Sequence, residues 1–234
     1  PPPPPPPPPR DSIRRQRQMC IRDRVDPVDE SPDAVFIEDA IVVFDDLAVV
    51  ARPGAPVRRS ETAGAEEAAR HLGLDVHRIE APGTLDGGDV LKVDRTAYVG
   101  VGGRTTLDAV NQLDTVLSPR GWIVRPVPVR RVLHLKSAVT ALPDGTIIGY
   151  PDHVDEVASY RRFMAMPEPE GAHIVLLGGD RLLMSSSAPV SADRLTTMGY
   201  RPVQVDISEF EKLEGCVTCL SVRVRQPAID VPEF

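Results

Sequence analysis

A cysteine, a histidine and an aspartate, far apart in the sequence, have the chemistry of a site built around a thiol nucleophile. Cys219 ends the run Gly215-Cys216-Val217-Thr218-Cys219, His134 precedes Leu135-Lys136-Ser137, and Asp86 begins Asp86-Gly87-Gly88-Asp89. A thiolate attacks an electrophilic carbon, an imidazole moves protons near neutral pH, and a carboxylate orients the imidazole. Such widely separated residues predict a site that forms only when the chain folds.

Each of these residues also has a structural interpretation. Cysteines are usually buried, histidines in apolar runs usually belong to the core, and Asp-Gly is a strong turn signal. Cys216 and Cys219 form a C-x-x-C pair, but a redox pair begins a helix, whereas residues 217–224 favour a strand. A zinc site would need two further ligands, and the sequence contains no second C-x-x-C or H-x3-H pair.

A second acidic run indicates a place for a cation. Asp33, Glu38 and Asp39 fall within seven residues and are interleaved with apolar side chains. The run is either a strand with solvated ends or a cluster whose charge is offset by a bound cation. Arg58 and Arg104 have the geometry to bind a carboxylate with two hydrogen bonds, although surface positions are the usual ones for arginine.

The overall composition is that of a globular protein. The chain has 234 residues, of which 41% are hydrophobic and 26% charged, and its net charge is -7. This charge argues against nucleic acid as the main partner and agrees with a small cationic substrate. No apolar run reaches the roughly 18 residues that cross a bilayer, and no secretory signal is visible. Three cysteines do not form a disulfide framework in a chain of this size, so we expect a cytoplasmic protein without membrane contact.

The first 24 residues differ from the rest of the chain. Pro1 to Pro9 form an unbroken polyproline run, and the basic stretch that follows has no helical or strand periodicity. The string Met19-Cys20-Ile21-Arg22-Asp23-Arg24 resembles translated sequencing-adaptor fragments. We therefore expect residues 1–24 to be a non-native or disordered segment and residues 25–234 a single catalytic domain. The alternative is a native proline-rich segment that docks into a groove of a partner protein.

The remaining residues alternate between short apolar runs and helical patterns. The order is strand, strand, helix, strand, repeated about every 45 residues, which predicts an α/β protein of several small units. Ser60 and Thr105 are expected to cap the first two helices. The predicted helices are 60–72, 105–117, 153–163 and 191–198, and a helical turn is predicted at 208–213. The predicted strands are 34–37, 40–44, 47–51, 76–79, 90–93, 97–101, 122–127, 138–142, 146–150, 174–177, 181–184, 203–205 and 217–224.

Taken together, the motifs resemble the dimethylarginine dimethylaminohydrolase family of the guanidine-modifying superfamily. Five stretches carry the resemblance, in the order and spacing of the family: 32–39, 52–59, 84–91, 134–137 and 213–221. The resemblance implies an α/β propeller of five ββαβ units around a pseudo-fivefold axis, with the active site in the central channel. It also implies that no metal or organic cofactor is needed.

The resemblance further implies a role for each candidate residue. Cys219 would be the nucleophile, His134 the general acid and base, and Asp86 the residue that orients His134. Asp39, with Glu38 beside it, would hold the guanidinium of an Nω-methylated arginine. Attack by the thiolate would release a methylamine, leave a thiouronium on Cys219 and, after hydrolysis, yield citrulline. The α-amine would be met by Asp33 and the main chain of Leu213, and the α-carboxylate by Arg58 and Arg104.

Two departures from the family pattern leave alternatives open. The first strand, first helix and substrate-covering lid of the family should precede Asp29, where this chain has the polyproline and arginine-rich stretch. The first propeller unit is therefore expected to be incomplete, and an inactive truncated homologue is one alternative. Cys216 stands where the family usually has an apolar residue. An arginine deiminase-type enzyme is the main rival activity, and a homodimer is expected only by family habit.

Overall fold

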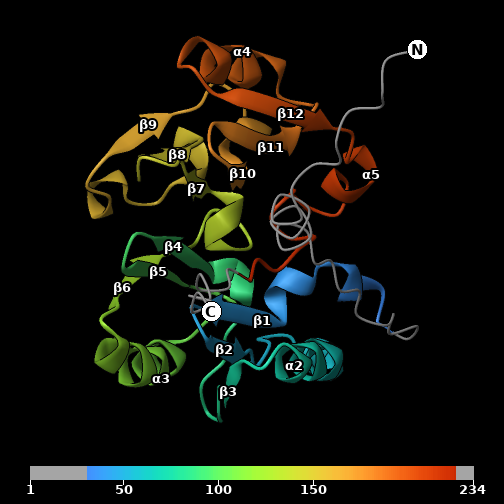
Figure 1. Ribbon diagram of the computed structural model, residues 1–234, viewed down its shortest axis with the longest axis vertical. Helices are drawn as coiled ribbons and strands as arrows, with labels where there is room; N and C mark the ends of the chain where they lie inside the picture. Colours follow the sequence, from blue (N-terminus) through green and yellow to red (C-terminus); the bar gives the residue numbers. More distant parts are fainter. Residues whose placement is uncertain (1–30, 225–234) are drawn as a thin grey trace, which may run out of the picture.

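The computed structural model describes residues 31–224, which form four three-stranded sheets that follow one another around the molecule (Figure 1). In each sheet an antiparallel hairpin is followed, after a crossover, by a third strand parallel to the second. The strands are β1 (Ile41–Phe44), β2 (Leu47–Val50) and β3 (Asp75–Arg78); β4 (Val90–Val93), β5 (Thr96–Val101) and β6 (Ile123–Pro128); β7 (Val139–Ala141), β8 (Ile147–Gly149) and β9 (Phe163–Ala165); β10 (Val175–Gly178), β11 (Arg181–Ser185) and β12 (Arg201–Val205).

This arrangement is an α/β propeller with four units among the described residues. The predicted segment 1–24 lies outside those residues. On the remaining side of the ring, the segments before β1 and after β12 pack together, with Phe36 edge-on to Phe210 at 6.3 Å between ring centroids. Phe36 also shares a small buried cluster with Cys216 and Cys219. The two ends of the described chain therefore meet beside the centre of the propeller.

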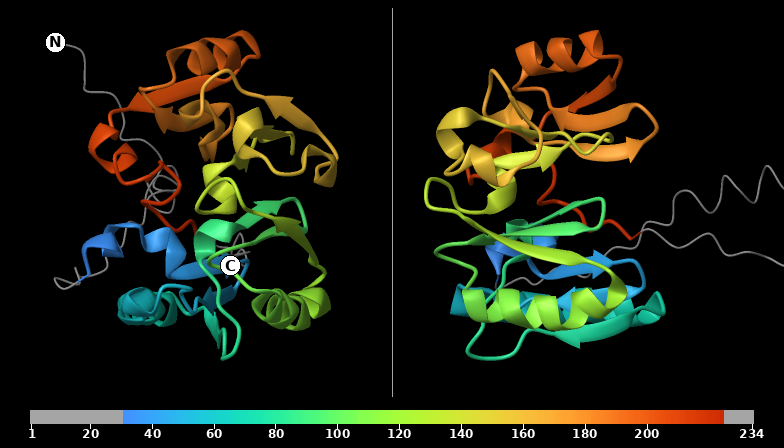
Figure 2. Two further views of the ribbon diagram at one scale, coloured as in Figure 1. Left: turned by 180° about the vertical axis from the view of Figure 1, so that it is seen from behind. Right: turned by 90° about the vertical axis from the view of Figure 1, so that its left-hand side faces the viewer.

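Helices make the crossover in three of the four units. They are α2 (Thr62–His71), α3 (Leu107–Leu117) and α4 (Pro189–Thr197), and α3 and α4 lie at opposite ends of the molecule (Figure 2). Each helix buries one face; in α3 this face consists of Ala109, Val110, Leu113 and Leu117. A shorter helix, α5 (Ser208–Glu211), follows β12. Every helix among residues 31–224 is too short or too polar to span a membrane.

The predicted helix 153–163 is wrong. The third crossover contains only two 3₁₀ turns, η7 (Pro151–His153) and η8 (Val157–Ser159), and residue 163 already begins β9. Val154 and Tyr160 are the side chains of this crossover that are buried in the core. Six residues apart, they would point about 120° from each other around an α-helix, so they would not share the i, i+3, i+4 face that a helix buries.

Two predicted strands are also wrong, and both flank the candidate site. Residues 34–37 belong to the 3₁₀ helices η1 (Pro32–Val35) and η2 (Ile37–Asp39), and residues 217–220 form a turn followed by chain outside any sheet. The turn is closed by the amide of Cys219, which donates to the carbonyl of Cys216 at 3.1 Å. The β-branched composition misled the prediction because strand propensity takes effect only where a neighbouring strand is present.

The predicted helix caps differ in detail. Ser60 lies inside a 3₁₀ helix, η3 (Pro56–Glu61), so α2 begins two residues later than expected. Thr106, not Thr105, precedes α3. The hydroxyl of Thr105 is used elsewhere, in the buried network described below.

The first strand of every unit faces the centre of the propeller. A cavity of about 400 Å³ is lined by residues from β1, β4, β7 and β10 and from the segment 218–223. Glu38, Lys136 and Thr218 also line it. The cavity therefore lies against the turns that carry the candidate site.

Candidate active site

Short 3₁₀ turns directly before the first strands contain or adjoin four of the candidate residues: Glu38, Asp39, Asp86 and His134. η2 precedes β1, η4 (Gly87–Asp89) precedes β4, and η6 (Leu135–Ser137) precedes β7. η4 contacts both η2 and η6. Because each turn occupies the same place in its unit, the propeller brings three distant sequence segments to one point near its axis.

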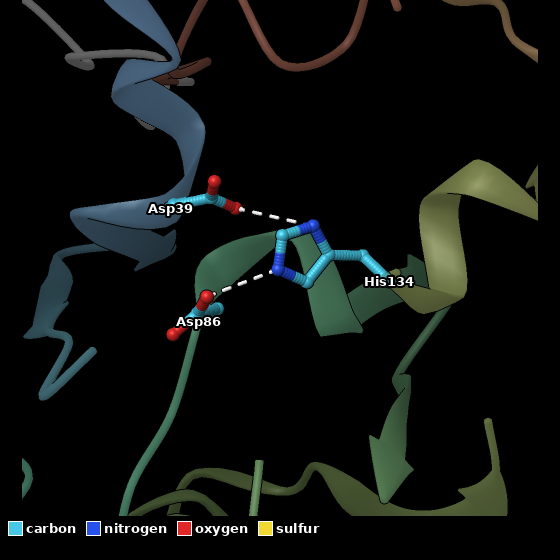
Figure 3. A group of neighbouring side chains, drawn as sticks. All are labelled: Asp39, Asp86 and His134. Carbon is cyan, nitrogen blue, oxygen red and sulfur yellow. Dashed lines mark hydrogen bonds and ion pairs between the residues drawn. The ribbon is translucent and has the colours of Figure 1, made fainter. Parts of the chain in front are cut away.

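His134 lies between two carboxylates (Figure 3). Its Nε2 is 3.0 Å from Oδ2 of Asp86, and its Nδ1 is 3.8 Å from Oδ1 of Asp39. The three residues come from three different units, and each is at least 96% buried. The structure thus brings together the predicted histidine and two of the predicted acids in a water-poor environment, where charge interactions are strong.

The environment of His134 favours its charged form. Burial lowers the pKa of this imidazole, but the hydrogen bond with Asp86 and the charges of Asp39 and Asp89 outweigh burial and raise the pKa to about 9. At neutral pH the ring is therefore an imidazolium. An imidazolium can give a proton to a leaving group.

A buried hydrogen-bond network fixes Asp86. Its Oδ1 accepts from the amide of Gly54 at 2.8 Å, and its own amide donates to Oγ1 of Thr105 at 3.1 Å. The Thr105 hydroxyl donates to Asp89 at 2.7 Å, and Asp89 accepts from the amide of Leu135 at 2.9 Å. This network joins the turns that carry Asp86 and His134. Burial raises the pKa of Asp89 to about 6.

The two glycines after Asp86 allow a close approach of the turns. A Cβ at Gly88 would lie 2.7 Å from Oδ1 of Asp39 and 2.9 Å from Cγ of His134, and a Cβ at Gly87 would lie 2.0 Å from the carbonyl oxygen of Glu38. The amide of Gly88 donates to Asp39 at 3.0 Å. Glycine at these two positions thus lets the backbone come close to His134 and Asp39.

Arg58 is buried and already paired. Its guanidinium bonds to Oδ2 of Asp39 at 2.7 Å and to Oε2 of Glu61 at 3.0 Å through Nε, and it donates to the main-chain carbonyl of Asp33 at 3.1 Å. Burial lowers the pKa of Arg58, but the hydrogen bonds to Glu61 and Asp39 outweigh it and the pKa is raised. Arg58 therefore pairs with Asp39 and ties η1 to η3.

Replacement of Arg58 by methionine is expected to reduce the free energy of unfolding by about 3–5 kcal/mol, because two buried carboxylates lose their partner. Urea unfolding measures this change. Arg104→Met is the matched control, since Arg104 is half-buried and forms no ion pair with residues 31–224; we expect a loss below about 1 kcal/mol. Equal losses in both variants would contradict the structural role of Arg58.

Glu38 is paired with Lys136 across two units. Nζ of Lys136 is 2.5 Å from Oε1 of Glu38, and each side chain is only 12% exposed. Burial raises the pKa of Glu38, and the Lys136 ammonium opposes this effect. Oε2 of Glu38 is buried and has no hydrogen-bond partner within residues 31–224. It is free to accept a hydrogen bond from a bound cation.

The cysteine turn joins the same region through η2. The carbonyl of Cys219 accepts from the amide of Glu38 at 3.1 Å, so adjacent residues of η2 contact the cysteine turn and His134. Sγ of Cys219 is 3.2 Å from Sγ of Cys216. The hydrogen bond between the thiols lowers the pKa of Cys216 and raises that of Cys219. Only one of two thiols this close can readily ionise at a time.

The other predicted residues lie outside this buried group. Asp33 is exposed, and Leu213 is 63% exposed in the turn after α5. The main chain of Arg104 lies against Gly54, the residue that donates to Asp86. Asp33 touches the buried group through its main-chain carbonyl, which accepts from Arg58, and Arg104 reaches it through Gly54.

Four residues that support the site were not predicted to be part of it: Thr105, Asp89, Glu61 and Lys136. Glu61 follows Arg58 by three residues, a spacing typical of helical ion pairs, and this signal was available. Asp89 and Lys136 lie within motifs that were noticed, but their partners come from other units. The sequence signal at Thr105 pointed to a helix cap and not to the buried network.

The donor set at the centre suits an organic cation. Ligand atoms of Asp39, Asp86 and His134 lie within 4.8 Å of one another, close enough to hold a metal ion. Each residue already has a protein partner, however: Asp39 binds Arg58, and Asp86 binds His134. A planar cation on Glu38 and Asp39 would leave these bonds in place, and the expectation of no metal therefore stays.

The chain is similar to proteins named dimethylarginine dimethylaminohydrolase. A Streptomyces coelicolor protein named N(G),N(G)-dimethylarginine dimethylaminohydrolase is 59% identical over 202 residues, covering 86% of this chain and 78% of the relative. The Pseudomonas aeruginosa protein of that name is 33% identical over 201 residues, covering 84% and 79%. A solved structure of a cysteine-to-serine variant of the Pseudomonas aeruginosa enzyme with citrulline has a TM-score of 0.78 and 32% identity, over 84% of this chain and 78% of that one. No family model matches the chain.

A propeller of ββαβ units that gathers a histidine, carboxylates and a cysteine turn near its axis is the architecture of the guanidine-modifying superfamily. Within that class, the sequence identity to the two named relatives decides the family. The chain belongs to the dimethylarginine dimethylaminohydrolase family.

Proposed function

We propose that this protein hydrolyses Nω-methylated arginine to citrulline and a methylamine, with Cys219 as nucleophile. The observation that carries the proposal is the placement of His134 between Asp86 and Asp39, because the turn η2 that carries Asp39 also binds the backbone of Cys219. The relatives named as dimethylarginine dimethylaminohydrolases support this choice of substrate class.

The substrate guanidinium binds to Glu38 and Asp39. The free Oε2 of Glu38 accepts from one guanidinium nitrogen, and the charge of Asp39 offsets the positive charge that enters the site. Asp33 and the main chain of Leu213 meet the α-amine. Arg104 and Arg58 meet the α-carboxylate; Arg104 is the freer of the two, because Arg58 is held by Asp39 and Glu61.

The reaction has two covalent steps. The pKa of Cys219 is raised in the resting site, and the bound guanidinium cation offsets this by favouring the thiolate. The Cys219 thiolate attacks the guanidinium carbon, and His134 protonates the methylamine nitrogen as its bond to that carbon breaks. A thiouronium remains on Cys219. His134, now neutral, takes a proton from water, the oxygen attacks the same carbon, and the C–S bond breaks to release citrulline. Because its pKa is raised to about 9, His134 carries at neutral pH the proton that the first step needs.

Citrulline release from asymmetric dimethylarginine, with arginine as the competing substrate, tests the proposal. We expect kcat/KM for the methylated substrate to exceed that for arginine. A higher value for arginine, with ammonium as the second product, would instead show the arginine deiminase activity.

Replacement of Lys136 by methionine is expected to raise KM for asymmetric dimethylarginine by roughly 10- to 100-fold at neutral pH, the value of one lost charge-assisted hydrogen bond. The pKa of Glu38 is already raised by burial, and without Lys136 it rises further, so a larger fraction of Glu38 is protonated and the guanidinium is attracted less. KM should therefore fall again as pH increases. Lys212→Met, which breaks the exposed pair with Glu209, is the control. Equal KM values in both variants would contradict the role of Lys136.

We further propose that residues 25–234 form the catalytic domain without residues 1–24, and that the enzyme works in the cytoplasm as a homodimer. The composition of the first 24 residues and the family resemblance support these points. Sedimentation analysis and the activity of a chain that starts at Val25 test them. A monomeric species or an inactive shortened chain would contradict the corresponding point.

A further inference from the structure

Cys216 is a buried thiol that the reaction does not use. Its Sγ lies 3.2 Å from Sγ of Cys219 and 3.2 Å from Oγ1 of Thr218. Cys216 is 3% exposed and Cys219 is 7% exposed, and both are free thiols. A second thiol in contact with the proposed nucleophile gives the site a chemistry beyond hydrolysis.

We propose that Cys216 and Cys219 form an oxidation site that a hydroperoxide converts to a reversible disulfide. The inference rests on the proposed function only for its consequence, the loss of the Cys219 nucleophile. The oxidation itself depends on the two sulfurs and their surroundings.

The backbone between the cysteines permits the bond. The amide of Cys219 donates to the carbonyl of Cys216, so the two residues occupy the first and last positions of a turn. The Cα atoms at the ends of such a turn are less than about 7 Å apart, and disulfides span roughly 4.4–6.8 Å. The sulfurs need to approach from 3.2 Å to about 2.05 Å.

The surrounding structure can absorb this small movement. Residues 217–220 are a turn, and residues 221–224 belong to none of the sheets. Closing the disulfide therefore breaks no ladder hydrogen bond.

The chemistry balances with a hydroperoxide as the only oxidant. The ionised thiol of the pair attacks one peroxide oxygen, the O–O bond breaks, and a sulfenic acid and hydroxide form. The second sulfur then attacks the sulfenic sulfur, the S–O bond breaks, and hydroxide leaves. Two thiols and hydrogen peroxide become one disulfide and two waters, so each sulfur loses one electron. A dithiol reductant reverses the change by exchange.

The lowered pKa of Cys216 makes it the more readily ionised sulfur in the resting pair. Since its partner is in contact, the sulfenic acid is captured before a second peroxide arrives. Capture prevents the irreversible steps to sulfinic and sulfonic acid. The pair thus protects Cys219 while it stops catalysis.

The test uses the full chain and hydrogen peroxide, followed by unfolding, alkylation of free thiols and mass spectrometry. We expect the mass to fall by two hydrogen atoms, a linked peptide that contains both cysteines, and nearly complete loss of citrulline release that dithiothreitol restores. Cys20→Ser should behave in the same way, since Cys20 is the remaining cysteine of the chain.

Cys216→Ala is the decisive variant. Under reducing conditions, the activity of this variant should remain within about threefold of that of the parent. Peroxide should now cause a loss of activity that dithiothreitol does not repair, with sulfinic acid at Cys219. Sulfinic acid in the parent, a disulfide to Cys20, or full recovery of Cys216→Ala by dithiothreitol would overturn the inference. A Cys216–Cys219 disulfide in a chain that releases no citrulline even when reduced would support the oxidation site and reject the proposed function.

Discussion

Replacing Cys219 with serine is expected to lower kcat for citrulline release from asymmetric dimethylarginine by at least about 10⁴-fold. A serine hydroxyl is a far weaker nucleophile than a thiolate towards a delocalised guanidinium carbon. It is also harder to ionise beside Glu38, whose amide binds the carbonyl of residue 219. Steady-state citrulline formation at saturating substrate gives the change directly.

The control for this prediction is Cys216→Ala, which removes a thiol of the same turn but leaves the proposed nucleophile. We expect kcat within about threefold of the parent under reducing conditions, as for a residue with no part in the transition state. Equal and large losses in both variants would favour a dithiol redox function. Urea unfolding of both variants separates loss of chemistry from loss of fold.

Replacing Asp86 with asparagine is expected to lower kcat by roughly 10²- to 10⁴-fold, the usual range for general acid–base catalysis. Asp86 holds Nε2 of His134 at 3.0 Å, and this bond is the strongest of the effects that keep the pKa of His134 near 9 against burial. Without it, burial lowers the pKa, and His134 is increasingly neutral at pH 7–8. The alkaline limb of the kcat/KM profile should therefore move from about 9 to lower pH.

The same interaction predicts how stability depends on pH. The pKa of His134 is raised in the folded protein from 6.5 to about 9, so its contribution is fully present below pH 6.5 and is lost as the pH rises through 9. The shift corresponds to roughly 3 kcal/mol at most. Urea unfolding at pH 6 and pH 9.5 measures the decline, which Asp86→Asn should reduce. Asp152→Asn, at an exposed position, should leave both the decline and the alkaline limb unchanged; an unchanged limb in Asp86→Asn would refute the assignment.

Most strands were predictable because their signal is local. The continuous apolar runs of β1 and β2 are joined by a turn in which Asp45 adopts a positive φ of 52°, a conformation that aspartate tolerates. The stretch 217–224 has similar composition but no partner strand, and sequence alone does not reveal whether a partner exists. The predicted helix 153–163 failed for a related reason, because the buried positions of a crossover depend on the sheet beneath it.

The candidate site likewise combines features that local sequence reveals with features that depend on the fold. The chemical types at positions 86, 134 and 219 were informative, because few combinations of residues support attack on a cationic carbon. Their supporting partners were not visible, because Thr105 reaches Asp89 and Lys136 reaches Glu38 only through the closure of the propeller. The roles of the proposed residues remain predictions for the experiments above.

The turns that precede β1, β4 and β7 belong to three separate units, and a ligand at their meeting point would touch all three. A bound ligand would therefore link the three units, and unfolding of any one of them would require release of the ligand. Thermal stability should rise with substrate-analogue concentration, by about 1.4 kcal/mol for each tenfold increase above Kd. In such a ring, the apparent affinity for the ligand depends on the fraction of molecules in which all three units are folded.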